Sequence, residues 1–206
     1  MKYYENFLKD YLDVDLLLEL RSVKEWKDFN RNKSHMKEYY SNGQFLTKLR
    51  SQLHSKTFIE WVEKQSGVKG LVVDSFGTGE GVSLMQSGDM LNSHIDFNWN
   101  SRINMHRAVN LLIYLGDCEG GKFEVWNDEK SKIIFEAKPI HNSAVLFNHS
   151  ETKSHGVDKV NSGKRYSIRQ FYYKSEATCN NPHQSLYWFN PQNKMPTNSY
   201  DQNNSI

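Results

Sequence analysis

The spacing of apolar residues changes part-way along this chain, near Gly67. Before that point, apolar residues recur every three or four positions in residues 3–28 and again in residues 44–65, which predicts two helical segments. After it come six or more short runs rich in Val, Ile, Phe and Tyr, separated by Gly, Asn, Asp and Pro. Such runs are typical of strands joined by turns. The order predicts an α+β chain whose helices pack on a closed or sandwiched antiparallel sheet.

The length of 206 residues fits one domain with a core of its own. We expect residues 1–206 to form this single domain in three parts. A helical flank covers about residues 1–67, a sheet core covers about 68–175, and a loop-rich tail covers 176–206, where Asn, Gln and Pro are frequent.

Charge and composition restrict the partners and the location of the protein. The net charge is +2, and Lys and Arg are scattered among Asp and Glu, so we expect no nucleic-acid partner. No run approaches 18 apolar residues, so we expect no membrane partner. The first residues lack the basic, apolar and cleavage regions of a secretory signal. Cys118 and Cys179 form neither a disulfide framework nor a C-x-x-C pair, and we expect a cytoplasmic protein with free thiols.

Residues 91–100 read LNSHIDFNWN, and in this apolar and aromatic setting His94 and Asp96 stand two positions apart. Side chains at i and i+2 of a strand share a face, so the imidazole and the carboxylate project side by side. With a second imidazole they make the 2-His-1-carboxylate set that binds non-heme Fe(II). A His-x-Asp triplet also arises by chance. The alternative is a partly buried histidine hydrogen-bonded to a neighbouring aspartate.

Residues 153–173, KSHGVDKVNSGKRYSIRQFYY, offer the missing partners. His155 supplies a second imidazole, and Arg165 opens an aromatic strand. A guanidinium in a core strand is costly unless an anion meets it, and its planar fork suits a carboxylate. A dianionic 2-oxo acid can chelate the metal at one end and reach an arginine with the other. His149 is the alternative third ligand, and Arg169 is the alternative partner of the anion.

These residues belong to a longer ordered set of motifs. It comprises H-I-D at 94–96, L-L-I-Y-L-G at 111–116, E-G-G-K-F-E-V-W at 119–126, S-H-G-V at 154–157 and G-K-R-Y-S-I at 163–168. In order and spacing the set resembles the Fe(II)/2-oxoglutarate-dependent dioxygenases, and in particular their prolyl 4-hydroxylase-like branch, over roughly residues 70–175. The resemblance implies a double-stranded β-helix (a jelly roll) for the core, with the N-terminal helices packed on its sheet.

The resemblance also implies roles for individual residues. His94, Asp96 and His155 match the family's iron ligands. Arg165 matches the basic residue that pairs with the far carboxylate of 2-oxoglutarate, and Tyr114 matches a tyrosine that hydrogen-bonds the same carboxylate in several members. For Tyr114 the alternative is a core aromatic residue without a role in binding.

The activity implied by the resemblance is hydroxylation, with Fe(II) as cofactor, 2-oxoglutarate and O₂ as co-substrates, ascorbate as a supporting reductant, and succinate and CO₂ as products. The expected substrate is a prolyl residue in a peptide or protein. A free amino acid or another small metabolite is the first alternative. Two further alternatives are a cupin-like metal enzyme that does not use 2-oxoglutarate and a catalytically silent binding module.

Several neighbouring features bear on the expected pocket. Some relatives carry a tyrosine three residues before the first histidine, where this chain has Leu91, so the pocket is expected to offer one hydrogen bond fewer. The Gly-containing residues 76–90 predict a lid or hairpin beside the iron. Residues 97–107 predict a facing wall in which Trp99 and Arg102 either contact substrate or lie in a surface loop.

Overall fold

The structure is a computed structural model that describes residues 1–31, 34–39, 43–176, 181–188 and 197–198. Cys179 lies outside the described residues, and Cys118 is a half-buried free thiol. None of the helices in the described part of the chain is long and apolar enough to span a lipid bilayer.

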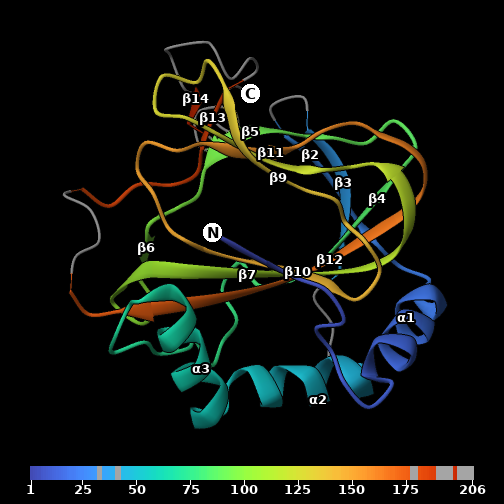
Figure 1. Cartoon of the computed structure of the whole chain (residues 1–206), viewed down its shortest axis with the longest axis horizontal. Coiled ribbons are helices and arrows are strands. Elements are labelled where there is room, and N and C mark those ends of the chain that lie inside the picture. Colours follow the sequence, from blue (N-terminus) through green and yellow to red (C-terminus); the bar gives the residue numbers. More distant parts are fainter. Residues whose placement is uncertain (32–33, 40–42, 177–180, 189–196, 199–206) are drawn as a thin grey trace.

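Two antiparallel sheets face each other and form the core (Figure 1). The larger sheet has the order β1 (Lys2–Tyr4), β10 (Ser143–Asn148), β7 (Met105–Gly120), β12 (Val160–Lys174), β4 (Gly81–Gln86), β3 (Ser34–Tyr39) and β2 (Lys27–Arg31), and β6 (Trp99–Asn100) pairs with β7. The smaller sheet has the order β14 (Thr197–Asn198), β13 (Leu186–Tyr187), β5 (Leu91–Ile95), β11 (His155–Val157), β8 (Phe123–Trp126) and β9 (Ile133–Ala137). The chain crosses repeatedly between the sheets, which confirms the predicted double-stranded β-helix.

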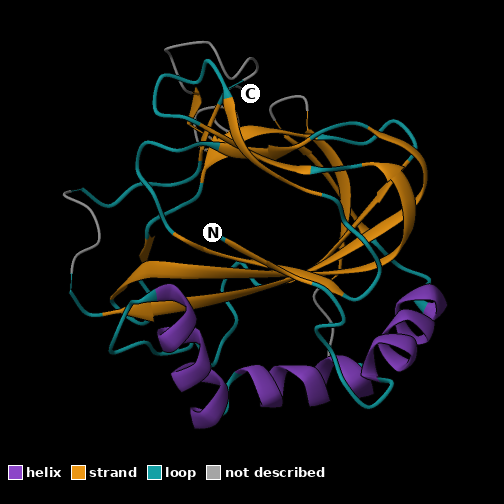
Figure 2. Cartoon of the chain, viewed as in Figure 1, coloured by secondary structure: helices purple, strands orange, loops and turns teal. Residues whose placement is uncertain are grey.

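Three helices lie along the outer face of the larger sheet (Figure 2): α1 (Leu12–Ser22), α2 (Gln44–Leu53) and α3 (Lys56–Ser66). Leucines of α1 and α2 and Val62 of α3 pack with outward-facing residues of β7 and β12 in the main hydrophobic cluster. The helix α3 begins where the Ser55 hydroxyl accepts a hydrogen bond from the Phe58 N–H, and it ends at Gly67 in the left-handed conformation. The predicted packing of N-terminal helices on the sheet is confirmed.

The strand β12 separates this helical layer from the interior of the jelly roll. Its outward residues Tyr166, Ile168 and Tyr172 belong to the cluster under the helices. Its inward residues Arg165, Ser167 and Arg169 line a cavity between the two sheets. One alternating strand therefore supplies both the apolar support and the polar interior.

The structure differs from the sequence pattern in four segments. The helix expected over 3–28 is restricted to α1, because residues before and after it pair into the larger sheet as β1, β2 and β3. The helix expected over 44–65 is two helices that meet at His54 and Ser55. Residues 68–76 make one isolated bridge rather than a strand. The tail is not only loop, since β13 and β14 extend the smaller sheet.

Candidate metal centre

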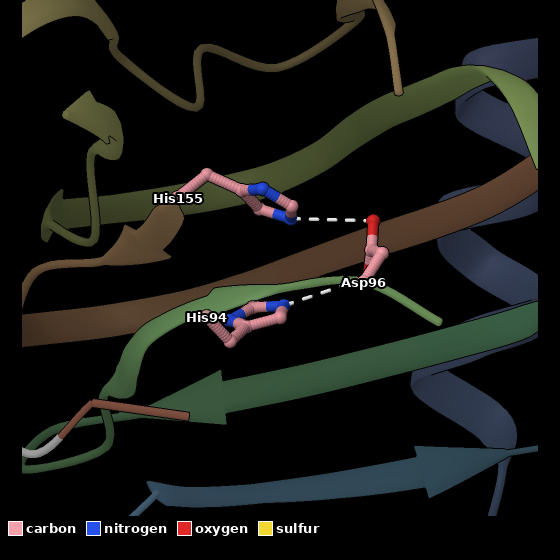
Figure 3. A group of neighbouring side chains, drawn as sticks. All are labelled: His94, Asp96 and His155. Atoms are coloured by element: carbon pink, nitrogen blue, oxygen red, sulfur yellow. Dashed lines mark ion pairs between the residues drawn. The ribbon is translucent and has the colours of Figure 1, made fainter. Parts of the chain in front are cut away.

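His94, Asp96 and His155 converge between the two sheets (Figure 3). His94 lies on β5 and His155 begins β11, and the two residues are direct partners across these antiparallel strands. Asp96 follows the end of β5. The Asp96 Oδ1 atom lies 3.6 Å from His94 Nε2, and Oδ2 lies 3.4 Å from His155 Nε2. One ligand atom from each residue lies within 4.8 Å of the others, as a shared metal ion requires.

The protonation of the two imidazoles suits a metal. The His94 Nδ1 atom lies 2.9 Å from the Asn92 carbonyl oxygen. A carbonyl only accepts, so Nδ1 carries the hydrogen and the Nε2 lone pair faces Asp96, which is the usual arrangement of a ligating histidine. Burial lowers the pKa of His155 to about 4, although the Asp96 charge acts in the opposite direction. His155 is therefore neutral at pH 7 and offers a lone pair as well.

Arg107 holds the carboxylate of this set, and the sequence analysis did not single it out. Its Nη2 atom lies 2.9 Å from Asp96 Oδ2, and its guanidinium stacks on the Phe171 ring at 3.4 Å from the centroid. Burial would raise the pKa of Asp96, but the charge of Arg107 beside it holds the pKa well below its usual value. Asp96 is thus an ionised carboxylate in a buried setting.

Arg165 is 2% exposed, and no carboxylate of the described residues lies within ion-pair distance of it. Its Nε–H donates to the Gly121 carbonyl oxygen at 2.9 Å, and Nη1 lies 3.7 Å from Met85 Sδ. Gly121 adopts a positive φ of 67°, and a Cβ atom there would lie 2.9 Å from Arg165 Cδ, so the glycine is needed for this approach. A buried guanidinium without a counter-charge is a site prepared for an anion.

The Tyr114 side chain lies beside this guanidinium, with Arg165 Cζ 4.8 Å from the ring centroid. Its hydroxyl is buried and donates to no acceptor among the described residues. Burial raises the pKa of Tyr114 to about 12, so the hydroxyl keeps its proton and can donate. Buried polar groups are nearly always satisfied, and this orphaned donor beside an uncompensated cation fits a carboxylate that both groups would bind.

A cavity of about 70 Å³ connects the two parts of the site. Its polar lining includes the three converging residues as well as Arg107 and Arg165, and its apolar lining includes Phe123, Phe147 and Phe171. The cavity therefore places a metal-ligating set and an anion-binding group in one enclosed, largely apolar space.

The two alternatives from the sequence analysis each have another partner. Arg169 also faces the interior, but its Nη2 atom is 2.9 Å from Glu38 Oε1, so its charge is already compensated. The imidazole of His149 faces Glu151, with Nε2 2.6 Å from Oε1, and does not join Asp96. Of the two candidate third ligands, the geometry selects His155.

The loops expected beside the iron are more ordered than predicted. Residues 81–86 form β4, whose residues 82–85 are buried, so the lid interpretation of 76–90 is wrong for its central part. In the segment 97–107, Trp99 lies on β6 with its ring against His106, at a centroid distance of 4.7 Å. Arg102 is exposed and stacks on the Phe76 ring at 3.5 Å.

Residues 81–173 match the family model of the 2OG-Fe(II) oxygenase superfamily, and the matched region contains every residue of the cavity described above. The match confirms the resemblance to this superfamily that the ordered motifs predicted. The protein is therefore an Fe(II)- and 2-oxoglutarate-dependent dioxygenase. The match implies Fe(II), 2-oxoglutarate and O₂, and the buried Arg165 guanidinium, the buried Tyr114 hydroxyl and the converging ligand atoms fit these groups.

Solved structures with the fold of this oxygenase include three prolyl hydroxylases. A prolyl hydroxylase from Trichoplax adhaerens, in complex with a peptide fragment of the hypoxia inducible factor oxygen degradation domain, superposes with a TM-score of 0.60 at 21% identity over 84% of this chain and 83% of that one. A prolyl-4-hydroxylase from Pseudomonas putida gives 0.60 at 14% identity, with 85% and 92% coverage. The viral collagen prolyl hydroxylase of Paramecium Bursaria Chlorella virus-1 gives 0.54 at 15%, with 85% and 96% coverage. No curated protein sequence matches the oxygenase.

Proposed function

We propose that this oxygenase hydroxylates a prolyl residue within a peptide or protein and converts 2-oxoglutarate to succinate and CO₂. The observation that supports this substrate is the likeness to prolyl hydroxylases over more than four fifths of the chain, one of them in complex with a peptide. The cavity offers a compatible surface, since Phe123, Phe147 and Phe171 line it together with Arg107 and Asp96. An aromatic wall of this kind suits the apolar ring of proline.

Each residue of the candidate site would have a separate role in binding. His94, Asp96 and His155 would hold Fe(II), which together with 2-oxoglutarate supplies the activation of O₂ when bound. Arg107 keeps the Asp96 carboxylate ionised and oriented. Arg165 and Tyr114 would bind the far carboxylate of 2-oxoglutarate, and the enclosing aromatic residues exclude water from the site.

A free amino acid or another small metabolite is the second candidate substrate, because the cavity itself contains nothing that demands a peptide. The family match and the uncompensated Arg165 speak against a cupin-like enzyme that does not use 2-oxoglutarate. The complete set of ligand atoms speaks against a silent binding module.

The substrate is tested by incubating the protein with Fe(II), 2-oxoglutarate and ascorbate in the presence of proline-containing peptides, free proline or unrelated metabolites. We expect succinate release coupled to the gain of one oxygen atom on a prolyl residue of a peptide, measured by mass spectrometry. Turnover confined to a small molecule without a prolyl group would reject the substrate and leave the oxygenase chemistry intact.

The ligand set is tested separately with His155→Ala. Loss of one of three protein ligands should abolish 2-oxoglutarate turnover while the far-ultraviolet circular dichroism remains that of the native sheet, since the core clusters do not include the metal. His141→Ala is the matched control, because His141 pairs with Asp13 outside the cavity. Full activity in His155→Ala would show that the third ligand is another residue.

A further inference from the structure

A second group of two imidazoles and one carboxylate lies outside the cavity. His149 and Glu151 follow β10, and His183 belongs to the C-terminal segment 181–188. The His149 Nε2 atom lies 2.6 Å from Glu151 Oε1, and the His183 Nε2 atom lies 2.7 Å from Glu151 Oε2. One ligand atom from each of the three lies within 4.8 Å of the others, the same criterion that the residues of the iron site meet.

The hydrogen bonds of His183 determine which ring nitrogen faces Glu151 and in what state. Its Nδ1 atom lies 2.7 Å from the Gln184 carbonyl oxygen, and because a carbonyl only accepts, Nδ1 carries the hydrogen. In the neutral ring Nε2 then has a lone pair, which points at a carboxylate oxygen that is also an acceptor. Two acceptors at 2.7 Å need a positive charge between them, either a proton on the ring or a metal ion. His94 shows the same pattern with the Asn92 carbonyl oxygen and Asp96.

The pair formed by His141 and Asp13 shows what an imidazole and a carboxylate do without a metal. The His141 Nδ1 atom accepts from the Gly116 N–H at 3.3 Å, so Nε2 carries the hydrogen and donates to Asp13 Oδ2 at 3.0 Å. Both ring nitrogens of His141 therefore have a hydrogen-bond partner while the imidazole is neutral. His183 has the opposite tautomer, in which the neutral ring has no hydrogen to give to Glu151.

We propose that His149, Glu151 and His183 form a second divalent-metal site, separate from the iron site, which takes Zn²⁺ and fastens the C-terminal segment. Two imidazoles and a carboxylate are a common zinc set, and imidazole sites bind Zn²⁺ more tightly than Fe(II). Zinc takes these ligands at about 2.0–2.2 Å in a tetrahedron, which separates ligand atoms by roughly 3.3 Å. The carboxylate must therefore withdraw by less than about 1 Å, and the Glu151 side chain, 35% exposed, has room to do so.

The protein holds the three ligands from outside the group. The His149 side chain is 3% exposed, and the backbone N–H of His149 donates to the Ala108 carbonyl oxygen on β7. The backbone N–H of His183 donates to Asn98 Oδ1 at 2.8 Å. The Asn98 side-chain N–H donates to Glu151 Oε1 at 3.3 Å.

The position of the site gives the metal a consequence for the iron centre. Beyond His183, the Ser185 hydroxyl accepts from the Phe97 N–H at 3.1 Å, and the Trp188 N–H donates to the Ser93 carbonyl oxygen at 2.7 Å. The Tyr187 ring stacks on His94 at a centroid distance of 4.9 Å, where β13 pairs with β5 (Figure 1). A metal at His183 would therefore anchor the segment that covers the first iron ligand.

The test uses the full chain with His94→Gln and His155→Gln, which removes two iron ligands and keeps the ion pair between Asp96 and Arg107. Metal-free protein is titrated with ZnCl₂ by isothermal calorimetry, and zinc per chain is measured after gel filtration. We expect one Zn²⁺ per chain. Adding Glu151→Gln or His183→Ala should weaken binding by more than the 10–100-fold that loss of an outer partner costs, whereas His141→Ala should leave it unchanged.

Hydrogen exchange tests the fastening. Zn²⁺ should slow exchange of the amides of residues 186–188 at least tenfold in the double variant and leave them unaffected after Glu151→Gln, a near-isosteric change that preserves the fold. Absence of stoichiometric zinc, or zinc that remains bound after Glu151→Gln and His183→Ala, would overturn the site. Bound zinc without slower amide exchange would show that the metal does not hold residues 186–188 in place. Because His94 and His155 are replaced in this variant, none of these outcomes depends on the proposed hydroxylation.

Discussion

Arg107 Nη2 lies 2.9 Å from Asp96 Oδ2 inside the jelly roll, and the guanidinium is fixed in this position by stacking on Phe171. The contact occupies one carboxylate oxygen and leaves Oδ1 facing His94. Asp96 therefore carries its own permanent counter-charge, and the protein can keep this ligand ionised and buried before any metal arrives.

Substitution of Arg107 should weaken iron binding. Outer partners that orient a metal ligand contribute about 10–100-fold to metal affinity, so we expect Arg107→Gln to raise the Fe(II) concentration needed for half-maximal 2-oxoglutarate turnover by about that factor. Removal of one partner of a buried ion pair should also lower the free energy of unfolding of the metal-free protein by about 3–5 kcal/mol, measured with urea. Arg102→Gln, at an exposed arginine, should change neither quantity. An unchanged Fe(II) requirement in Arg107→Gln would contradict the role.

Arg165 should set the 2-oxoglutarate requirement. Its guanidinium is buried and has no acidic partner among the described residues, so its loss should cost about 3–5 kcal/mol of co-substrate binding, or about two to four decades in the apparent affinity for 2-oxoglutarate. Arg165→Lys should restore only part, because lysine lacks the planar fork. Arg169→Ala is the comparison, since that charge already pairs with Glu38. A larger loss of 2-oxoglutarate affinity in Arg169→Ala than in Arg165→Ala would assign the co-substrate carboxylate to Arg169.

Tyr114→Phe should have opposite effects on stability and on binding. The hydroxyl is buried without a partner in the described structure, so its removal should leave the free energy of unfolding of the metal-free protein unchanged or raise it by about 1 kcal/mol. The same hydroxyl would donate to a charged carboxylate, and its loss should weaken the apparent 2-oxoglutarate affinity by about tenfold. Urea unfolding and initial rates measure the two effects. A destabilised protein with normal affinity would identify Tyr114 as a core residue only.

Glu80 should make stability depend on pH. It is 7% exposed on the helical side of the larger sheet, 3.6 Å from Arg50, and burial raises its pKa from 4.5 to about 7. The native state keeps this proton where the unfolded state loses it, so stability falls as pH rises from about 4.5 to 7, by roughly 3 kcal/mol. In Glu80→Gln that part of the fall should disappear. Urea unfolding at pH 5 and pH 8 measures how the free energy of unfolding of each protein depends on pH. The same dependence in both proteins would refute the raised pKa of Glu80.

The fold and the shared face of His94 and Asp96 could be predicted because each depends on local patterns. A two-residue alternation determines which side chains of a strand face inward, so the residue order alone was enough to place His94 and Asp96 side by side. The ordered motifs then supplied His155 and Arg165. The over-long first helix has a different origin: Tyr3 pairs with Val145 across β1 and β10, and such distant pairing overrides the local spacing.

Arg107 could not be found in this way, because strict alternation along β7 places it on the outer face with Val109. The pairing with β12 is irregular there, since Val109 faces Tyr172 while Arg107 faces Tyr173, which leaves Ala108 as an extra residue. Such a β-bulge turns the following side chain to the opposite face. No pattern in a single sequence marks that bulge. The position of His183 beside Glu151 was equally hidden, because it depends on where the tail returns to the sheet.

The direct pairing of His94 with His155 also constrains when the site can exist during synthesis. The two residues are about 60 positions apart, and the chain between them forms β6 to β10 of both sheets. A nascent chain that has emerged only as far as β10 holds His94 and Asp96 without the third ligand. Non-local strand pairing of this kind is slow, on the order of milliseconds to seconds, and comes late in folding. Metal affinity should therefore appear abruptly, when β11 inserts beside β5, so that capture of iron reports the closure of the whole barrel.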